Sequence, residues 1–159
     1  MSNIINIQPI SIVILFKLDS VDRLENVIAV TDHLSMTSNS KIILAEVDTK
    51  VNKIISKLIK HPVNYMFFYD PDPILYRTFF INKVAEKIST RIIVIWDTDV
   101  ICPIDQLNKA IEVLQNDEAD FVYPYDKFFL DTSPILRKLY IRTGDINFLL
   151  KNMKKMKEM

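Results

Sequence analysis

The chain has 159 residues, 49% of them hydrophobic, and its 20 basic residues balance its 20 acidic ones. This composition predicts one globular domain with a sizeable core, and the zero net charge excludes binding to nucleic acid through the protein's overall field. The single cysteine excludes a disulfide framework, and the single glycine excludes the glycine-rich loops of Rossmann dinucleotide sites and Walker-type nucleotidases. Turns that need a positive φ should therefore use Asn or Asp.

The N-terminal residues 1–16 lack a basic leader and a small-residue cleavage site, the two features of a signal peptide. Their apolar stretch is interrupted by Asn6, Gln8 and Pro9 and is shorter than the roughly 20 residues that a membrane span needs. Together with the lone cysteine, these features predict a cytoplasmic protein without a transmembrane segment.

Short apolar runs alternate with helical patterns along the chain. Residues 11–16 predict a buried strand, and the apolar spacing from Val21 to Leu34 predicts a helix with Asp19 or Ser20 as its N-cap. Further strands are predicted at 41–45, 65–69, 92–96 and 121–123, and further helices at 51–59, 75–88, 103–114, 135–141 and 146–156. This alternation is typical of an α/β protein with a mostly parallel sheet.

Carboxylates fall at the predicted carboxyl ends of three strands. They belong to Glu46, Asp48, Asp70, Asp97 and Asp99. In open parallel sheets, ligands bind just beyond this edge. The pattern therefore predicts a binding site where these side chains converge.

Asp97 and Asp99 follow the most apolar run of the chain, residues 92–96. Residues i and i+2 of an extended segment point to the same side, so the two carboxylates can hold one divalent cation between them. Their hard oxygen atoms suit Mg²⁺ or Mn²⁺. Three interpretations remain open: a strand end that caps the next helix, a haloacid-dehalogenase-like phosphatase with Asp97 as nucleophile, and a transferase whose metal clamps the diphosphate of a nucleotide-sugar.

The segment after the first predicted strand matches the spacing R/K-x-D-S-x-x-R-x-x-N, with Lys17, Asp19, Ser20, Arg23 and Asn26. The stretches ILAEVD, LYRTFFINKVAEKISTRIIVIWDTDVICP and EADFVYPYDKFF follow in order. Together, these motifs resemble family-2-like glycosyltransferases of the GT-A fold, most closely the branch of bacterial capsular and exopolysaccharide synthesis. The resemblance covers roughly residues 10–130 and implies a three-layer, Rossmann-like α/β fold with a mostly parallel central sheet.

The resemblance implies that four carboxylates serve a nucleotide-diphosphate sugar and its metal. Asp99 would be the direct ligand of Mn²⁺ or Mg²⁺, and Asp97 would contact the ribose or share the metal through water. Glu46 would lie beside the nucleotide base, with Asp48 as its rival for that role.

Three further residues of the resemblance lie on predicted helices. Arg23 and Arg77 would face the nucleotide or its phosphates, where a planar guanidinium binds oxygen atoms in pairs. Asn82 would hold the helix that leads to the metal-binding strand. Alternatively, the two arginines are ordinary solvated helix residues, and Asn82 only bridges the backbone.

The second half of the family, which supplies the acceptor site and the catalytic base, has no counterpart after Asp131. We therefore expect a single donor-binding domain over 1–159, with a core at about 10–130 and a helical segment at 133–159. Its function would be to bind a nucleotide-sugar for transfer to a saccharide acceptor in bacterial polysaccharide synthesis. One alternative is a catalytically incomplete, nucleotide-binding remnant or interaction module, which could form homo-oligomers through the face that the missing half would cover. The other alternative is the phosphatase named above.

Overall fold

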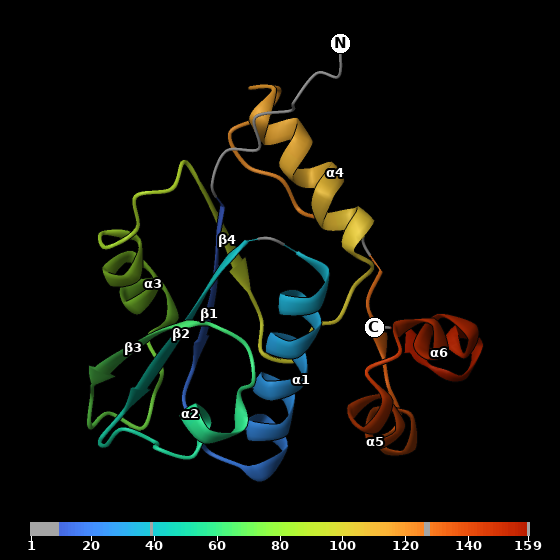
Figure 1. Cartoon of the computed structure of the whole chain (residues 1–159), viewed down its shortest axis with the longest axis horizontal. Helices are drawn as coiled ribbons and strands as arrows, with labels where there is room; N and C mark the ends of the chain where they lie inside the picture. The colour runs from blue at the N-terminus through green and yellow to red at the C-terminus, as the bar shows by residue number, and fades with distance from the viewer. Residues whose placement is uncertain (1–9, 39, 126–127, 159) are drawn as a thin grey trace.

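The computed structural model describes residues 10–38, 40–125 and 128–158. Its central sheet contains β1 (Ile10–Phe16), β2 (Lys41–Asp48), β3 (Asn64–Tyr69) and β4 (Ile92–Trp96), in the order β3-β2-β1-β4 (Figure 1). All neighbouring pairs in this sheet are parallel. The prediction of an α/β protein with a parallel sheet is therefore confirmed.

Helices cover both faces of this sheet. α1 (Val21–Thr37), the short α2 (Ile55–Leu58) and α4 (Ile104–Gln115) contribute to the core on one face, and α3 (Arg77–Ala85) covers the other (Figure 1). α1 begins where the sequence indicated, because the Ser20 hydroxyl caps it by accepting a hydrogen bond from the backbone N–H of Arg23.

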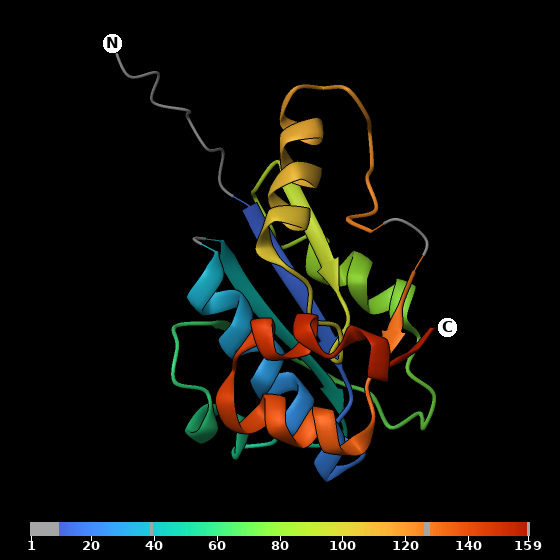
Figure 2. The same cartoon turned by 90° about the vertical axis from the view of Figure 1, so that its right-hand side faces the viewer.

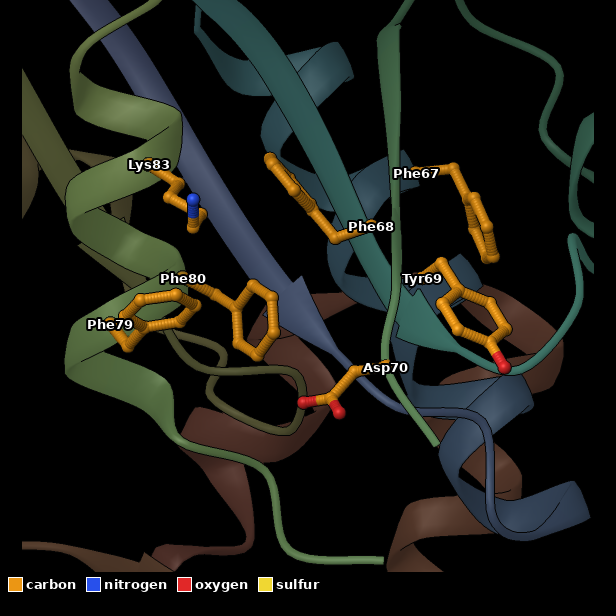
Figure 3. Close-up of a pocket in the computed structure, with 7 residues that line it drawn as sticks. All are labelled: Phe67, Phe68, Tyr69, Asp70, Phe79, Phe80 and Lys83. Atoms are coloured by element: carbon orange, nitrogen blue, oxygen red, sulfur yellow. The ribbon is translucent and has the colours of Figure 1, made fainter. Parts of the chain in front are cut away.

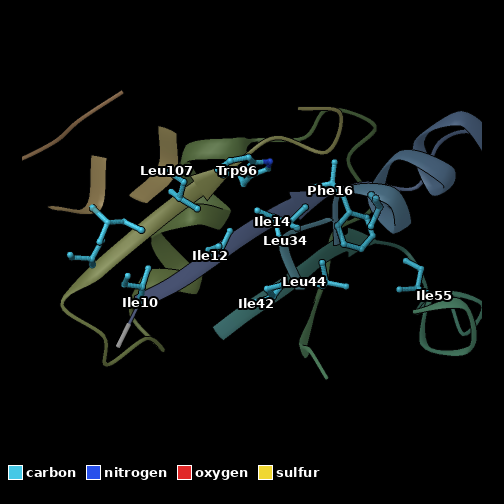
Figure 4. Close-up of a cluster of buried hydrophobic side chains, with 14 residues drawn as sticks. Ile10, Ile12, Ile14, Phe16, Leu34, Ile42, Leu44, Ile55, Trp96 and Leu107 are labelled. Atoms are coloured by element: carbon cyan, nitrogen blue, oxygen red, sulfur yellow. The ribbon is translucent and has the colours of Figure 1, made fainter. Parts of the chain in front are cut away.

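The two faces of β1 fill two separate cores. Ile12, Ile14 and Phe16 point into the larger core, which Leu34 of α1 and Leu107 of α4 complete (Figure 4). The alternate residues of the same strand pack against α3 in the smaller core. Burial on both faces explains why β1 is apolar at every position except Ser11 and does not alternate with polar residues.

The C-terminal segment folds back onto the helix layer. It contains α5 (Pro134–Thr143), α6 (Ile146–Lys151), a short 3-10 helix (Met153–Lys155) and a two-stranded antiparallel ribbon of β5 (Leu130–Asp131) with β6 (Lys157–Glu158). α5 lies over α1 (Figure 2), to which it is tied by Arg137. Gly144 ends α5 with φ 64°. Among the described residues, the other positive φ, 57°, belongs to Asp117, as expected of an Asp in a chain with so little glycine.

Three predictions of secondary structure were wrong. The predicted strand at 121–123 is irregular, because Pro124 cannot donate to a ladder and the rings of Phe121 and Tyr123 pack edge to face in solvent. β2 continues through Asp48, so Glu46 lies inside the strand and not beyond it. The helix predicted at 51–59 is only one turn long, over Ile55–Leu58.

Other boundaries moved by a few residues. α3 begins at Arg77 and not at 75, after the irregular segment that holds Pro71 and Pro73. The helix predicted at 146–156 divides into α6 and the 3-10 helix. In the described part of the chain, no helix is both long and apolar enough to cross a membrane.

Candidate functional site

The carboxyl ends of the four parallel strands meet at one edge of the sheet, and hydrogen bonds join several of the segments at this edge. The backbone N–H of Asp70 donates to the Asp48 carbonyl at 3.1 Å, which joins the ends of β3 and β2. Lys17, just after β1, donates through its ammonium group to the backbone carbonyl of Asp72. Asp48, Asp70 and Asp97 lie at or just past the ends of β2, β3 and β4, whereas Glu46 lies within the sheet.

Asp97 and Asp99 lie on a tight turn that directly follows β4. Residues 98–99 form the turn, so the segment is not extended as the sequence suggested. Exposed and buried side chains nevertheless alternate along it. Thr98 is buried, whereas Asp97 and Asp99 are exposed. The Trp96 indole N–H closes the turn by donating to the Val100 carbonyl at 2.9 Å. Both carboxylates are therefore presented to solvent on an anchored loop.

A second contact fixes the segment that follows this turn. The Nε2 atom of His33, a buried residue of α1, lies 2.9 Å from the backbone carbonyl oxygen of Cys102. Burial lowers the pKa of His33 and raises the pKa of the Cys102 thiol to about 11. At neutral pH, Cys102 is thus a protonated thiol beside the turn and not a nucleophile.

Arg77 and Asp97, two of the predicted site residues, contact each other directly. Arg77 is the first residue of α3, and its guanidinium donates to the Asp97 carboxylate as an ion pair. Their side chains are 47% and 54% exposed. An ion pair so open to water contributes only about 0.2–1 kcal/mol, so ligand charges can readily displace it.

The two carboxylates of the turn can bind only a metal whose remaining ligands are water or substrate oxygens. Among the described residues, no group of three or more His, Cys, Asp or Glu side chains is placed to hold a metal ion. Asp97 and Asp99 offer hard carboxylate oxygens on one exposed turn. Mg²⁺ is commonly bound by one or two carboxylates, with water and substrate phosphates completing its octahedron. The turn fits that mode of binding and not an enclosed structural metal site.

Glu46 lies in the larger core, beside Phe16 of β1, and is 0% exposed. Its Oε2 atom accepts hydrogen bonds from the Tyr65 hydroxyl and from the backbone N–H of Asn52, the latter at 3.2 Å. Its Oε1 atom is buried and has no hydrogen-bond partner among the described residues. Burial and the Glu46 carboxylate together raise the pKa of Tyr65. Glu46 is therefore closed to solvent in this structure, and the backbone of Asn52 is one of the groups that contact it.

Asp48, the rival of Glu46, is the more accessible of the two. It is the last residue of β2, partly exposed, and its Oδ1 atom accepts a hydrogen bond from the Thr49 backbone N–H at 2.6 Å. Asp48 therefore lies at the strand edge where ligands of parallel sheets bind.

In the structure, Arg23 forms an ion pair with Asp19. Its Nε atom donates to the Asp19 carboxylate at 2.8 Å, a bond that lowers the pKa of Asp19. Asn82 is an exposed residue of α3, and its backbone carbonyl accepts from Glu86 at the end of that helix. The roles predicted for Arg23 and Asn82 therefore stay predictions.

Asn26 and Arg137 form a contact that the sequence did not reveal. The Arg137 Nε atom donates to the Asn26 side-chain oxygen at 2.9 Å, and its guanidinium also pairs with Asp22 and Glu25. Residues 26 and 137 are 111 positions apart, so no local pattern could indicate this contact. Lys17 and Trp96 did carry a signal, because each borders a predicted strand end.

A cavity of about 430 Å³ lies between β3 and α3, outside the predicted site. Phe68, Phe79 and Phe80 form its aromatic wall, with Asp70 at one end and Lys83 at the other (Figure 3). The Lys83 ammonium lies 4.8 Å from the centre of the Phe79 ring. The cavity shares only Asp70 with the carboxylates predicted from the sequence.

The predicted carboxylates and Arg77 thus separate into two groups. Arg77, Asp97, Asp99 and Asp48 lie at the carboxyl edge of the sheet, whereas Glu46 is enclosed beneath a helix layer. A scan against protein-family models and a search of curated proteins both find no match to this chain.

Proposed function

We propose that the chain is a nucleotide-sugar-binding domain of the GT-A glycosyltransferase type, dependent on Mg²⁺ or Mn²⁺, that serves bacterial polysaccharide synthesis. The observation that carries the proposal is the exposed turn of Asp97 and Asp99 at the carboxyl edge of a parallel sheet, with Arg77 beside it. The spaced motifs between Lys17 and Asp99 support the same interpretation.

The residues at this edge suit the parts of a nucleotide-diphosphate sugar. Asp99 would hold the metal directly, and Asp97 would share it or bind the ribose. The metal, when bound, would neutralise the diphosphate as it leaves the sugar. Arg77 would bind phosphate oxygens through its planar guanidinium, and Asp48 would receive the base or the ribose.

Glu46 has a different place in this proposal from the one that the sequence suggested. Because it is fully buried, it would contact a base only after the segment around Asn52 opens. In the closed arrangement, Glu46 holds that segment against the sheet. We therefore assign the direct contact with the nucleotide to Asp48 and a supporting role to Glu46.

Sugar transfer also needs a base that accepts the proton of the acceptor hydroxyl, which contributes on the order of 10²–10⁴ to the rate. We assign this role to none of the described residues. The function proposed for this chain is therefore donor binding, and transfer would require an acceptor site in addition.

Thermal unfolding with UDP, GDP, CDP and ADP, each with and without Mn²⁺, tests the proposal. A ligand at about 100 times its Kd stabilises a fold by roughly 2.7 kcal/mol, which is about 5–10 °C for a domain of this length. We expect a metal-dependent shift with one nucleotide that Asp99→Ala abolishes. The exposed Asp120 provides the control, since Asp120→Ala should keep the shift.

Two outcomes would replace the proposal. Turnover of a generic aryl phosphate that disappears in Asp97→Asn would favour the phosphatase interpretation. Unfolding curves that do not respond to any nucleotide, combined with self-association, would favour the interaction module.

A further inference from the structure

Arg77 forms an ion pair with Asp97, the carboxylate that, in the proposed function, shares the metal with Asp99 or binds the ribose. Its guanidinium donates to the Oδ1 atom of Asp97, while Asp99 remains exposed two residues further along. A positive charge of the chain itself therefore lies at the place where a divalent cation would bind. The two cations cannot both use this oxygen fully, because they repel each other at contact distance.

We propose that Arg77 is a built-in counter-ion of Asp97 that competes with the divalent metal until a nucleotide diphosphate draws it away. This inference rests on the proposed function. Metal and nucleotide then bind cooperatively: the nucleotide removes Arg77 from Asp97, and Asp97 becomes free to share the metal. By linkage, the metal raises the affinity for the nucleotide by the same factor.

The position of Arg77 allows this exchange. It is the first residue of α3, directly after an irregular segment, and its side chain is about half exposed. A diphosphate offers paired oxygen atoms that match a guanidinium better than the single Asp97 oxygen does. An exposed ion pair changes an equilibrium constant by at most about fivefold, so the competing contact is weak enough to release.

Two other basic residues, which follow β1 in the chain, are engaged elsewhere. The Lys17 ammonium donates to the Asp72 carbonyl, and Arg23 pairs with Asp19 within its own helix turn. Among the described residues, Arg77 is thus the basic residue that forms an ion pair with a carboxylate of the Asp97 turn. Its charge, and not the general charge of the edge, should control metal binding there.

The chain has a natural reporter for the test. Trp96 is the only tryptophan, directly precedes Asp97 and closes the turn through its indole N–H. Paramagnetic Mn²⁺ bound at Asp97 or Asp99 should quench its fluorescence, whereas diamagnetic Mg²⁺ should not. A titration with Mn²⁺ therefore reads occupancy at the turn itself.

The experiment compares wild type, Arg77→Gln and Arg91→Gln, with Mn²⁺ alone and with saturating UDP, GDP, CDP or ADP. Arg91 is the matched control, because it is exposed to a similar degree as Arg77 and forms an ion pair with Asp117, away from the turn. We expect Arg77→Gln to bind Mn²⁺ alone about two- to fivefold more tightly than wild type. One nucleotide should tighten Mn²⁺ binding in wild type and Arg91→Gln, and much less in Arg77→Gln.

The outcomes separate this inference from the function on which it rests. Equal Mn²⁺ affinity of wild type and Arg77→Gln, with nucleotide binding intact, would overturn the inference and leave the function standing. If no nucleotide binds to any variant, the proposed function fails, and tighter binding of Mn²⁺ alone to Arg77→Gln would still support the competition. Arg77→Lys provides a second check, because it keeps the positive charge but loses the planar guanidinium. It should bind Mn²⁺ alone as tightly as wild type does.

Discussion

Tyr65→Phe tests the buried carboxylate of Glu46, the most unusual polar group in the core. The substitution removes only a hydroxyl, which donates to the Oε2 atom of Glu46. The carboxylate would keep one hydrogen bond, from the backbone N–H of Asn52, while its Oε1 atom already has no partner in the described structure. Because Glu46 is 0% exposed, water cannot replace the lost donor without opening the core.

Hydrogen bonds to charged groups contribute about 1.5–3 kcal/mol, and a buried acceptor that loses its partner bears its full desolvation cost. Tyr65→Phe should therefore lower the free energy of unfolding by about 2 kcal/mol, or the Tm by roughly 4–8 °C. Urea unfolding followed by circular dichroism measures this change.

Tyr69→Phe is the matched control, because the Tyr69 side chain on the same strand is 68% exposed and its hydroxyl can bond to water. It should change stability by less than about 0.5 kcal/mol. A Tyr65→Phe protein as stable as wild type would refute the reasoning, because it would mean that Glu46 does not depend on this donor. A double-mutant cycle with Glu46→Gln isolates the coupling between the two side chains.

Three further predictions concern the core, the C-terminal segment and the thiol. Leu107→Ala removes a side chain that is 2% exposed in the larger core and should cost about 2–5 kcal/mol of stability in urea unfolding, whereas Leu150→Ala, at a site 41% exposed, should cost far less. Arg137→Ala should speed hydrogen exchange in α5 and leave the sheet protected, since Arg137 ties that helix to α1; uniform exchange rates would contradict this. Cys102, with its pKa raised to about 11, should react slowly with a thiol reagent at pH 8 and faster as pH rises toward 11; rapid reaction at pH 7 would contradict its burial.

The parts of the fold that depend on continuous apolar runs could be predicted from the sequence. β4 was predicted over the residues it occupies, because its run of five apolar residues ends at the first carboxylate, Asp97. β2 was cut short for the same reason: Glu46 resembles a strand end, and only the tertiary structure shows a tyrosine hydroxyl beside it.

The strand expected at 121–123 shows the limit of local propensity. Phe121 and Tyr123 favour strands, but a strand forms only where a neighbour offers backbone groups and a face to bury. In the structure these two side chains are 74% and 67% exposed, and Pro124 follows at once. The local sequence pattern alone does not show whether a partner strand lies beside the segment.

The candidate site was predictable as an edge but not as a set of contacts. Parallel topology was enough to expect carboxylates together beyond the strand ends. The pairing of Arg77 with Asp97 spans 20 residues, and the pairing of Arg137 with Asn26 spans 111. Such contacts depend on how helices pack and have no periodic trace in the sequence.

The central claim is that the turn of Asp97 and Asp99 binds a metal together with a nucleotide diphosphate. The most direct measurement is calorimetric titration of UDP, GDP, CDP and ADP into wild type and Asp99→Ala, with Mn²⁺ and with a chelator. Our expectation is that one nucleotide binds wild type only when Mn²⁺ is present and does not bind Asp99→Ala. Binding of equal strength in wild type with chelator, or in Asp99→Ala with Mn²⁺, would contradict it.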